Sequence, residues 1–276
     1  MSADLQALPN PFATLLNGIE NNPRAIRDLC DHHRVTRQAA STAALLSSDN
    51  IVVDPILVNV VKEGESSDPR NSLVVWTRPS QAVKQLVRDV QRALRAIEPA
   101  IWLMPEADLH MTTMEWFHSV DTETAHGITD KIPLDVVQSI TTGPKTPVLL
   151  DTPVLSFDQH ALAITFLPSL QTHDVYTYLH YRRDLVDTAA SVHDPDLAIK
   201  MRYAAPSAHV TIARFKEPLA RNNTTRSWVE ALERIDRDIV RPRQDLVWKI
   251  EGPAIMRAGT VWYGGGWTLK GSLRQN

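Results

Sequence analysis

Cysteine is almost absent from this sequence, since Cys30 is the only one among 276 residues. A single cysteine excludes an intrachain disulfide and the cysteine clusters that hold structural zinc, and a reducing compartment is the simplest setting. No stretch approaches the roughly 18 apolar residues of a membrane helix, and the N-terminus lacks the pattern of a secretory signal. We therefore expect a soluble protein without a membrane partner, located in the cytoplasm, with the nucleus as the alternative.

An excess of basic charge is also missing, because 29 Lys and Arg residues face 32 Asp and Glu residues and the formal net charge is -3. Binding of long duplex nucleic acid depends on a broad positive field. A nucleic-acid partner should therefore be short or held in a local pocket. The sequence also has no low-complexity tract and no Gly-rich phosphate loop. Its hydrophobic share of 43% and charged share of 22% are typical of a folded globular protein.

The N-terminal part of the chain predicts a mainly helical extension. Residues 1–50 carry apolar side chains at helical spacing, whereas residues 51–61 favour short extended runs. The polar segment 62–71 has turn chemistry and marks a boundary. We therefore divide the chain into an extension over residues 1–70 and a main domain over residues 71–276.

The main domain alternates strands and helices. Residues 72–77 predict a strand, and residues 80–97 predict an amphipathic helix with a single apolar stripe: Val83, Leu86, Val87, Val90 and Leu94. Further along the chain the pattern predicts an extended run over 100–116, a helix broken near Pro133 over 121–140, two strands over 147–168, a helix over 173–193, an extended run over 200–215, a helix over 224–240, a strand over 245–252 and a hairpin over 259–271. The order strand, helix, strand therefore occurs twice.

Each of the two extended runs contains the tripeptide His-x-Thr. His110 and Thr112 form the first pair, and His209 and Thr211 form the second, 99 residues later. With 10 histidines, about one such tripeptide is expected by chance, so the presence of two is weak evidence for a site. Their position inside apolar extended runs is the stronger indication.

Side chains on a strand alternate between its two faces, and this predicts two sets that each share a face. The sets are His110, Thr112, Met114 and Trp116 in the first run, and His209, Thr211, Ala213 and Phe215 in the second. The conservative interpretation is that both histidines are structural and satisfied by their neighbours.

The alternative interpretation is that the pairs are two halves of one site. Two histidines that titrate near neutrality can act as base and acid on opposite sides of a phosphorus atom. Each threonine hydroxyl can donate to a non-bridging phosphate oxygen and stabilise charge in the transition state. This chemistry requires no metal.

The segments "DLHMTTMEW" and "AHVTIARF" resemble the paired signatures of the 2H phosphoesterase superfamily, which includes RNA 2',3'-cyclic phosphodiesterases and RNA ligase-like proteins. The segments "SLVVWTRPSQAVKQLV" and "IWLMPEADLHMTTMEW" are similar to the family's opening strand and helix and to its approach to the first motif. The resemblance covers about residues 72–270, and the first 70 residues have no counterpart in it.

The resemblance implies an α+β fold with two lobes related by pseudo-two-fold symmetry, in which two antiparallel sheets surround a central cleft and helices lie outside. It implies that His110 and His209 are catalytic and that Thr112 and Thr211 bind phosphate. The expected activity is metal-independent opening of 2',3'-cyclic phosphates on nucleotides or short RNA ends, without a cofactor, by a monomer. The alternatives are 3'-5' trimming of RNA ends and a catalytically silent module that binds nucleotides or RNA.

Four further residues are candidates for substrate binding. Trp116 and Tyr263 are aromatic side chains near the predicted cleft strands, and Tyr263 is the stronger candidate for stacking on a base. Arg202 and Tyr203 precede the second motif, where they can line the cleft. Arg182 is expected on a solvated helix face.

Overall fold

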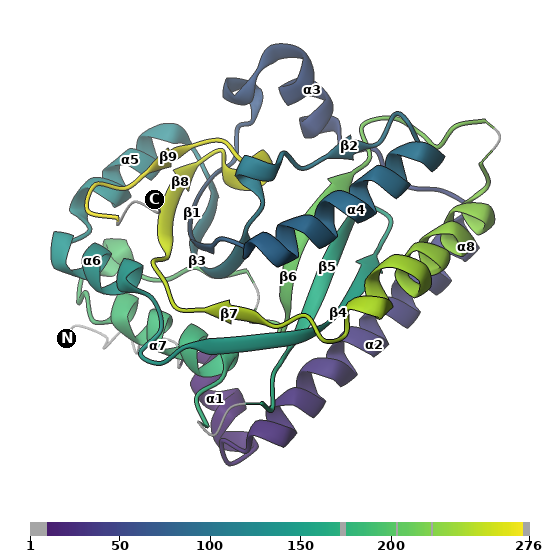
Figure 1. Ribbon diagram of the computed structural model, residues 1–276. Coiled ribbons are helices and arrows are strands. Elements are labelled where there is room, and N and C mark those ends of the chain that lie inside the picture. Colours follow the sequence, from purple (N-terminus) through teal and green to yellow (C-terminus); the bar gives the residue numbers. More distant parts are fainter. Residues whose placement is uncertain (1–9, 172–174, 203, 222, 273–276) are drawn as a thin grey trace.

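Two antiparallel β-sheets form the framework of the protein, and helices pack around them (Figure 1). The computed structural model describes residues 10–171, 175–202, 204–221 and 223–272. The first sheet has the strand order β3-β1-β8-β9, and the second has the order β2-β6-β5-β4-β7. All strand pairings within the described residues are antiparallel, which confirms the predicted α+β class with two antiparallel sheets.

The strands of the first sheet are β3 (Met111–Val120), β1 (Asn71–Thr77), β8 (Ile255–Gly259) and β9 (Trp267–Thr268). Those of the second sheet are β2 (Trp102–Leu103), β6 (Ala208–Arg214), β5 (Ala161–Pro168), β4 (Val148–Phe157) and β7 (Trp248–Ile250). Strands β3 and β6 carry the two His-x-Thr motifs and contact each other where the sheets meet. The edge of the first sheet therefore lies against the second sheet at the two motifs.

The helices around the sheets are α1 (Pro11–Gly18), α2 (Pro23–Ser48), α3 (Pro55–Glu63), α4 (Gln81–Ile97), α5 (Thr122–Lys131), α6 (Leu134–Thr142), α7 (Tyr178–Ala190) and α8 (Thr225–Ile235). The five apolar residues of the predicted stripe on α4 are all buried, so that prediction is confirmed. The predicted break near Pro133 is confirmed by the boundary between α5 and α6. Within the part of the chain that the structure describes, no helix is both long enough and apolar enough to cross a membrane.

The first three helices start in the same way. A capping side chain, Asn10, Asn22 or Asp54, accepts hydrogen bonds from the following backbone amides, and a proline occupies the first helical position. This combination favours a helix start because proline has no amide to satisfy and its φ is already helical. The predicted extended runs over 51–61 are therefore wrong at α3, where Asp54 and Pro55 begin a helix.

Helix α2 is part of the fold's core. It packs on β4, β5 and α8, and its buried residues Ile26, Cys30 and Leu45 join the same hydrophobic cluster as the sheets (Figure 1). Burial raises the pKa of the Cys30 thiol to about 12, so this cysteine is an inert core residue. Helices α1 and α2 therefore share one hydrophobic core with the sheets.

Both motif strands contain a β-bulge just after the threonine. In β3, Met114 pairs with Val75 and Thr112 pairs with Trp76, so Thr113 is an extra residue. In β6, Ala213 pairs with Leu162 and Thr211 pairs with Ala163, so Ile212 is extra. An extra residue reverses the alternation of side chains beyond it.

The predicted faces are consequently right as far as each threonine and wrong after it. The four residues predicted to follow on the motif face are buried in the core: Met114, Trp116, Ala213 and Phe215. Glu115 and Arg214, each three residues after a motif threonine, take their place beside the motif side chains.

The glycine triplet near the C-terminus lies between β8 and β9, which pair as a hairpin. The loop contains a 3-10 turn over Val261–Tyr263, and Gly266 has a φ of +81°. A Cβ atom at Gly266 would collide with the carbonyl oxygen of Ala258, so glycine is required there. The predicted hairpin is confirmed, and its loop brings Trp262 to the motif strands.

Candidate functional site

The four motif side chains line one cavity of about 330 Å³, which we call the cleft. His110 precedes β3 directly and Thr112 lies on it, while His209 and Thr211 lie on β6. The two tripeptides therefore come from different sheets and are brought together only where those sheets meet.

His110 is held in a defined tautomer. Its Nδ1 lies 2.6 Å from the carbonyl oxygen of Asp108, and because a carbonyl can only accept, Nδ1 carries the proton. The ring stacks on Trp76 at 3.8 Å between centroids with 16° between the planes. Neutral His110 is therefore left with an unprotonated Nε2, the state that a general base requires.

The pKa of His110 is lowered to about 3, mainly by burial and in part by the positive charges of Arg78 and Arg257, against the opposing effect of the hydrogen bond to Asp108. Burial is also the main cause that lowers the pKa of His209 to about 4, with added effects of Arg182, Arg37 and Arg214. Both imidazoles are consequently neutral at pH 7 in the empty cleft.

His209 has a weaker local partner than His110. Its Nδ1 lies 3.1 Å from the hydroxyl oxygen of Ser207, which can either donate to or accept from the ring. The hydroxyls of Thr112 and Thr211 have no hydrogen-bond partner among the described residues. These hydroxyls can therefore donate to an oxygen of a bound molecule.

Arg182 is a buried residue of the cleft, so its predicted place on a solvated helix face is wrong. From α7 its Nε donates to the carbonyl oxygen of Thr113 at 2.8 Å, and its Nη1 donates to that of Ala205 at 2.6 Å. Its guanidinium also lies 4.1 Å from the ring centroid of Phe12. Arg182 thus joins the bulge of β3 to the segment that leads into β6.

Arg202 lines the cleft, as predicted from its place upstream of the second motif. Its guanidinium forms an ion pair with Glu115 at 2.9 Å and lies 4.5 Å from the ring centroid of Trp262. Tyr203, the neighbouring candidate, lies outside the described residues.

The two aromatic candidates do not line the cleft. Trp116 is 1% exposed, and its indole N–H donates to the carbonyl oxygen of Leu197 at 2.7 Å. Tyr263 is also buried, and its hydroxyl donates to Asp54 at 2.6 Å. Trp116 is turned away by the bulge of β3, and Tyr263 is turned away by the 3-10 turn that presents Trp262 instead.

Glu115, Arg214 and Trp262 are among the cleft residues that the sequence did not predict as site residues. The first two depend on the bulges, which the strict alternation of a regular strand does not anticipate. Trp262 is the neighbour of the predicted Tyr263, so the sequence pointed to the correct loop. The sequence did not show which side chain of the 3-10 turn faces the cleft.

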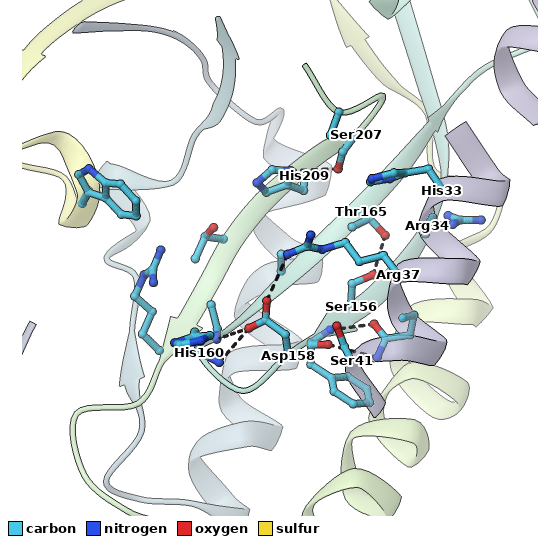
Figure 2. A pocket seen from close by; sticks show the side chains of 18 residues that line it. His33, Arg34, Arg37, Ser41, Ser156, Asp158, His160, Thr165, Ser207 and His209 are labelled. Atoms are coloured by element: carbon cyan, nitrogen blue, oxygen red, sulfur yellow. Dashed lines mark hydrogen bonds and ion pairs between the residues drawn. The ribbon is translucent and has the colours of Figure 1, made fainter. Parts of the chain in front are cut away.

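A second cavity of about 440 Å³ adjoins the cleft, and we call it the α2 pocket (Figure 2). The two cavities share Ser207, His209, Thr211, Arg214 and Trp262 as lining residues. The opposite wall of the α2 pocket is formed by α2. His209 therefore borders both cavities. Among the described residues, no group of three or more His, Cys, Asp or Glu side chains is placed to hold a metal ion.

Comparison with known proteins leaves the family open. No family model matches the sequence, and no curated protein matches it. Among solved structures, the conserved protein of unknown function ATU0111 from Agrobacterium tumefaciens strain C58 is 11% identical, with a TM-score of 0.45 over 73% of this chain and 86% of that one. The protein TT0787 of Thermus thermophilus is 12% identical, with a TM-score of 0.41 over 73% of this chain and 100% of that one. The case for a function rests on the cleft.

Proposed function

We propose that the protein is a metal-independent phosphodiesterase of the 2H phosphoesterase type that opens 2',3'-cyclic phosphates on nucleotides or RNA ends. The observation that carries the proposal is that two His-x-Thr pairs from different sheets line one cleft. The pairs supply two imidazoles and two hydroxyls, and the cleft also contains Arg182 and Arg214. The two hydroxyls have no hydrogen-bond partner among the described residues. This set matches the needs of in-line hydrolysis at phosphorus.

In the proposed reaction, a water molecule attacks the phosphorus of the cyclic phosphate. Nε2 of His110 takes a proton from the water as its oxygen bonds to phosphorus. The bond from phosphorus to one ribose oxygen breaks, and His209 donates a proton to that oxygen. The product is a phosphomonoester beside a free ribose hydroxyl, and proton exchange with solvent restores both histidines.

The assignment of base and acid follows from the hydrogen bonds of the two rings. His110 donates its Nδ1 proton to a backbone carbonyl, so only Nε2 is available as a base. Nδ1 of His209 lies 3.1 Å from the hydroxyl oxygen of Ser207, which can accept a hydrogen bond, so this ring can carry a proton on both nitrogens. A bound phosphate adds a negative charge beside His209 and raises its pKa toward neutrality.

The threonines and arginines act on the phosphate oxygens. Thr112 and Thr211 donate hydrogen bonds to the non-bridging oxygens, where charge develops in the transition state. The guanidinium of Arg214 adds a positive charge on the same side as Thr211. Such interactions are stronger in a partly buried site than in water. The cleft is therefore expected to stabilise the charged transition state more than free solution does.

The first test is hydrolysis of 2',3'-cyclic AMP by the purified protein in EDTA. We expect turnover to one phosphomonoester, with a rate that added Mg²⁺ or Mn²⁺ leaves unchanged. Dependence on added metal would contradict the proposal. Shortening of a linear RNA would favour the exonuclease alternative. Tight binding of the nucleotide with no product would favour the silent binding module.

The lowered pKa values predict an acid-shifted pH dependence. The free enzyme is competent when His110 is neutral, above about pH 3, and His209 is protonated, below about pH 4. We therefore expect kcat/KM to fall by about tenfold per pH unit as the pH rises above that range. The falling limb of kcat should lie at higher pH, because bound phosphate raises the pKa of His209. Initial rates across pH 3 to 9 check this, and a kcat/KM that rises from pH 5 to 8 would refute it.

A further inference from the structure

We propose that helix α2 forms a second anion subsite, so that the preferred substrate is an oligonucleotide whose next phosphate binds at Arg37. This inference rests on the proposed phosphodiesterase function and names its substrate class. It assigns a binding role to the N-terminal part of the chain. Arg37 lies on α2, in the wall of the α2 pocket that faces the motif strand β6 (Figure 2).

Helix α2 is firmly anchored by three polar residues. Arg27 donates to Asp151 at 2.6 Å, to Thr152 at 2.7 Å and to the carbonyl oxygen of Pro168 at 2.7 Å. Arg34 and Gln38 bind backbone atoms of β4. The polar groups of these residues are used up in fixing the helix to the second sheet.

Arg34 and Gln38 border the pocket as well, and beside them a second set of α2 residues lines it. His33, Arg37 and Ser41 follow one another at intervals of four residues and therefore lie on one stripe of the helix. The side chain of Arg34 is 12% exposed, whereas that of Arg37 is 68% exposed and has only a long ion pair of 3.5 Å with Asp158. Figure 2 shows Arg37 reaching from α2 into the pocket, below His33 and His209. This exposed guanidinium can therefore contact a ligand beside its ion pair with Asp158.

Arginine side chains dominate the charged lining of the pocket. Arg34, Arg37 and Arg214 line it, and Asp158 is the one carboxylate among the described lining residues. Arg34 and Arg214 are only 12% and 15% exposed and pair with carboxylates that do not line the pocket, so the 68% exposed Arg37 is the cation placed to meet an anion. The carboxylate of Asp158 is held in place by the turn before β5, where it accepts from the backbone amides of His160 and Ala161. Burial is the main cause that lowers the pKa of His33 and of His209, and the nearby positive charge of Arg37 adds to both shifts.

The pocket is continuous with the cleft at His209 and Thr211. A phosphate that is attacked in the cleft lies at one end of this combined cavity, and the 5' side of an RNA chain can extend toward α2. A mononucleotide 2',3'-cyclic phosphate has no second phosphate and leaves this region unoccupied. The α2 pocket is therefore expected to select for length.

The test compares 2',3'-cyclic AMP with a trinucleotide, ApApA, that ends in a 2',3'-cyclic phosphate. We expect wild type to favour the trinucleotide by tenfold or more in kcat/KM. Arg37→Gln should lower the ratio of the two kcat/KM values by about tenfold, and Arg37→Lys should restore part of it. Arg24→Gln is the matched control, because Arg24 is an exposed residue of the same helix outside the pocket, and it should leave the ratio unchanged.

Calorimetry on the same variants measures the binding of ApApA 3'-phosphate and of 3'-AMP. This measurement tests the subsite at Arg37 separately from the proposed activity. If wild type hydrolyses both substrates equally and Arg37→Gln changes neither ratio nor binding, the subsite is refuted and the proposed function stands. If no substrate is hydrolysed but Arg37→Gln weakens ApApA 3'-phosphate selectively, the proposed activity fails and the subsite stands. A steeper loss of trinucleotide affinity with salt in wild type than in Arg37→Gln would support a direct phosphate contact.

Discussion

His110→Ala and His209→Ala each lower kcat for 2',3'-cyclic AMP by about a thousandfold, while both proteins remain folded. General acid and base catalysis contribute on the order of 10² to 10⁴ in rate, and each variant removes one of the two groups. The stability cost is limited to a few contacts. His110 loses a stack on Trp76, which is worth about 0.5 to 1.5 kcal/mol, and a hydrogen bond to the carbonyl oxygen of Asp108, while His209 loses one hydrogen bond to Ser207.

The measurement is initial-rate kinetics in EDTA, with thermal melting of each protein alongside. His193→Ala is the matched control, because His193 is exposed and lies outside both cavities, and it should keep wild-type activity. The double variant His110→Ala with His209→Ala should be little worse than either single variant, since the two histidines act in one step. Variants that stay active at more than a tenth of the wild-type rate would overturn the catalytic assignment. Variants that unfold would support the structural interpretation of the histidines.

Arg182→Met lowers the free energy of unfolding by about 3 kcal/mol and reduces activity with it. The substitution keeps most of the side chain's volume but leaves the carbonyl oxygens of Thr113 and Ala205 without their charged donor. Hydrogen bonds to charged groups contribute about 1.5 to 3 kcal/mol each. A buried carbonyl oxygen that is left without a donor adds its desolvation cost. The contact with Phe12 is lost as well. Urea denaturation followed by circular dichroism measures the change.

Arg183→Met is the matched control for Arg182. Arg183 is the next residue on α7, but its guanidinium pairs with Asp184 at 2.7 Å near the surface. A pair of this kind contributes about 0 to 1 kcal/mol, so Arg183→Met should stay close to wild type. Equal destabilisation by both substitutions would show that Arg182 does not hold the two motif strands together. Arg182→Lys should recover the charge but not both hydrogen bonds, because lysine lacks the planar fork.

Local sequence patterns were sufficient for the elements that frame the cleft. The apolar stripe of α4 has a helical period, and all five of its members are buried. The strand over 72–77 and the break near Pro133 also follow from neighbouring residues alone. The start of α3 also follows from neighbouring residues. Asp54 and Pro55 form a capping pair, and recognising this pair would have predicted α3 correctly.

Long-range packing decided which residues complete the site. A β-bulge is defined by the register between two strands, so the sequence of β3 or β6 alone does not reveal that Glu115 and Arg214 replace Met114 and Ala213 in facing the motif side. The exchange of Tyr263 for Trp262 likewise depends on how a 3-10 turn docks against β1.

The sequence by itself determined the α+β class, the order of the elements and the two His-x-Thr strands, because these depend on periodicity and side-chain chemistry within short segments. Only the tertiary structure decided that the strands meet at one cleft and that α2 forms the wall of the adjoining pocket. Such contacts join residues that are far apart in the sequence: the two motifs are separated by 99 positions, and Gln38 and Phe157 by 119. Their free energy comes from packing and hydrogen bonding between elements, which no local pattern encodes.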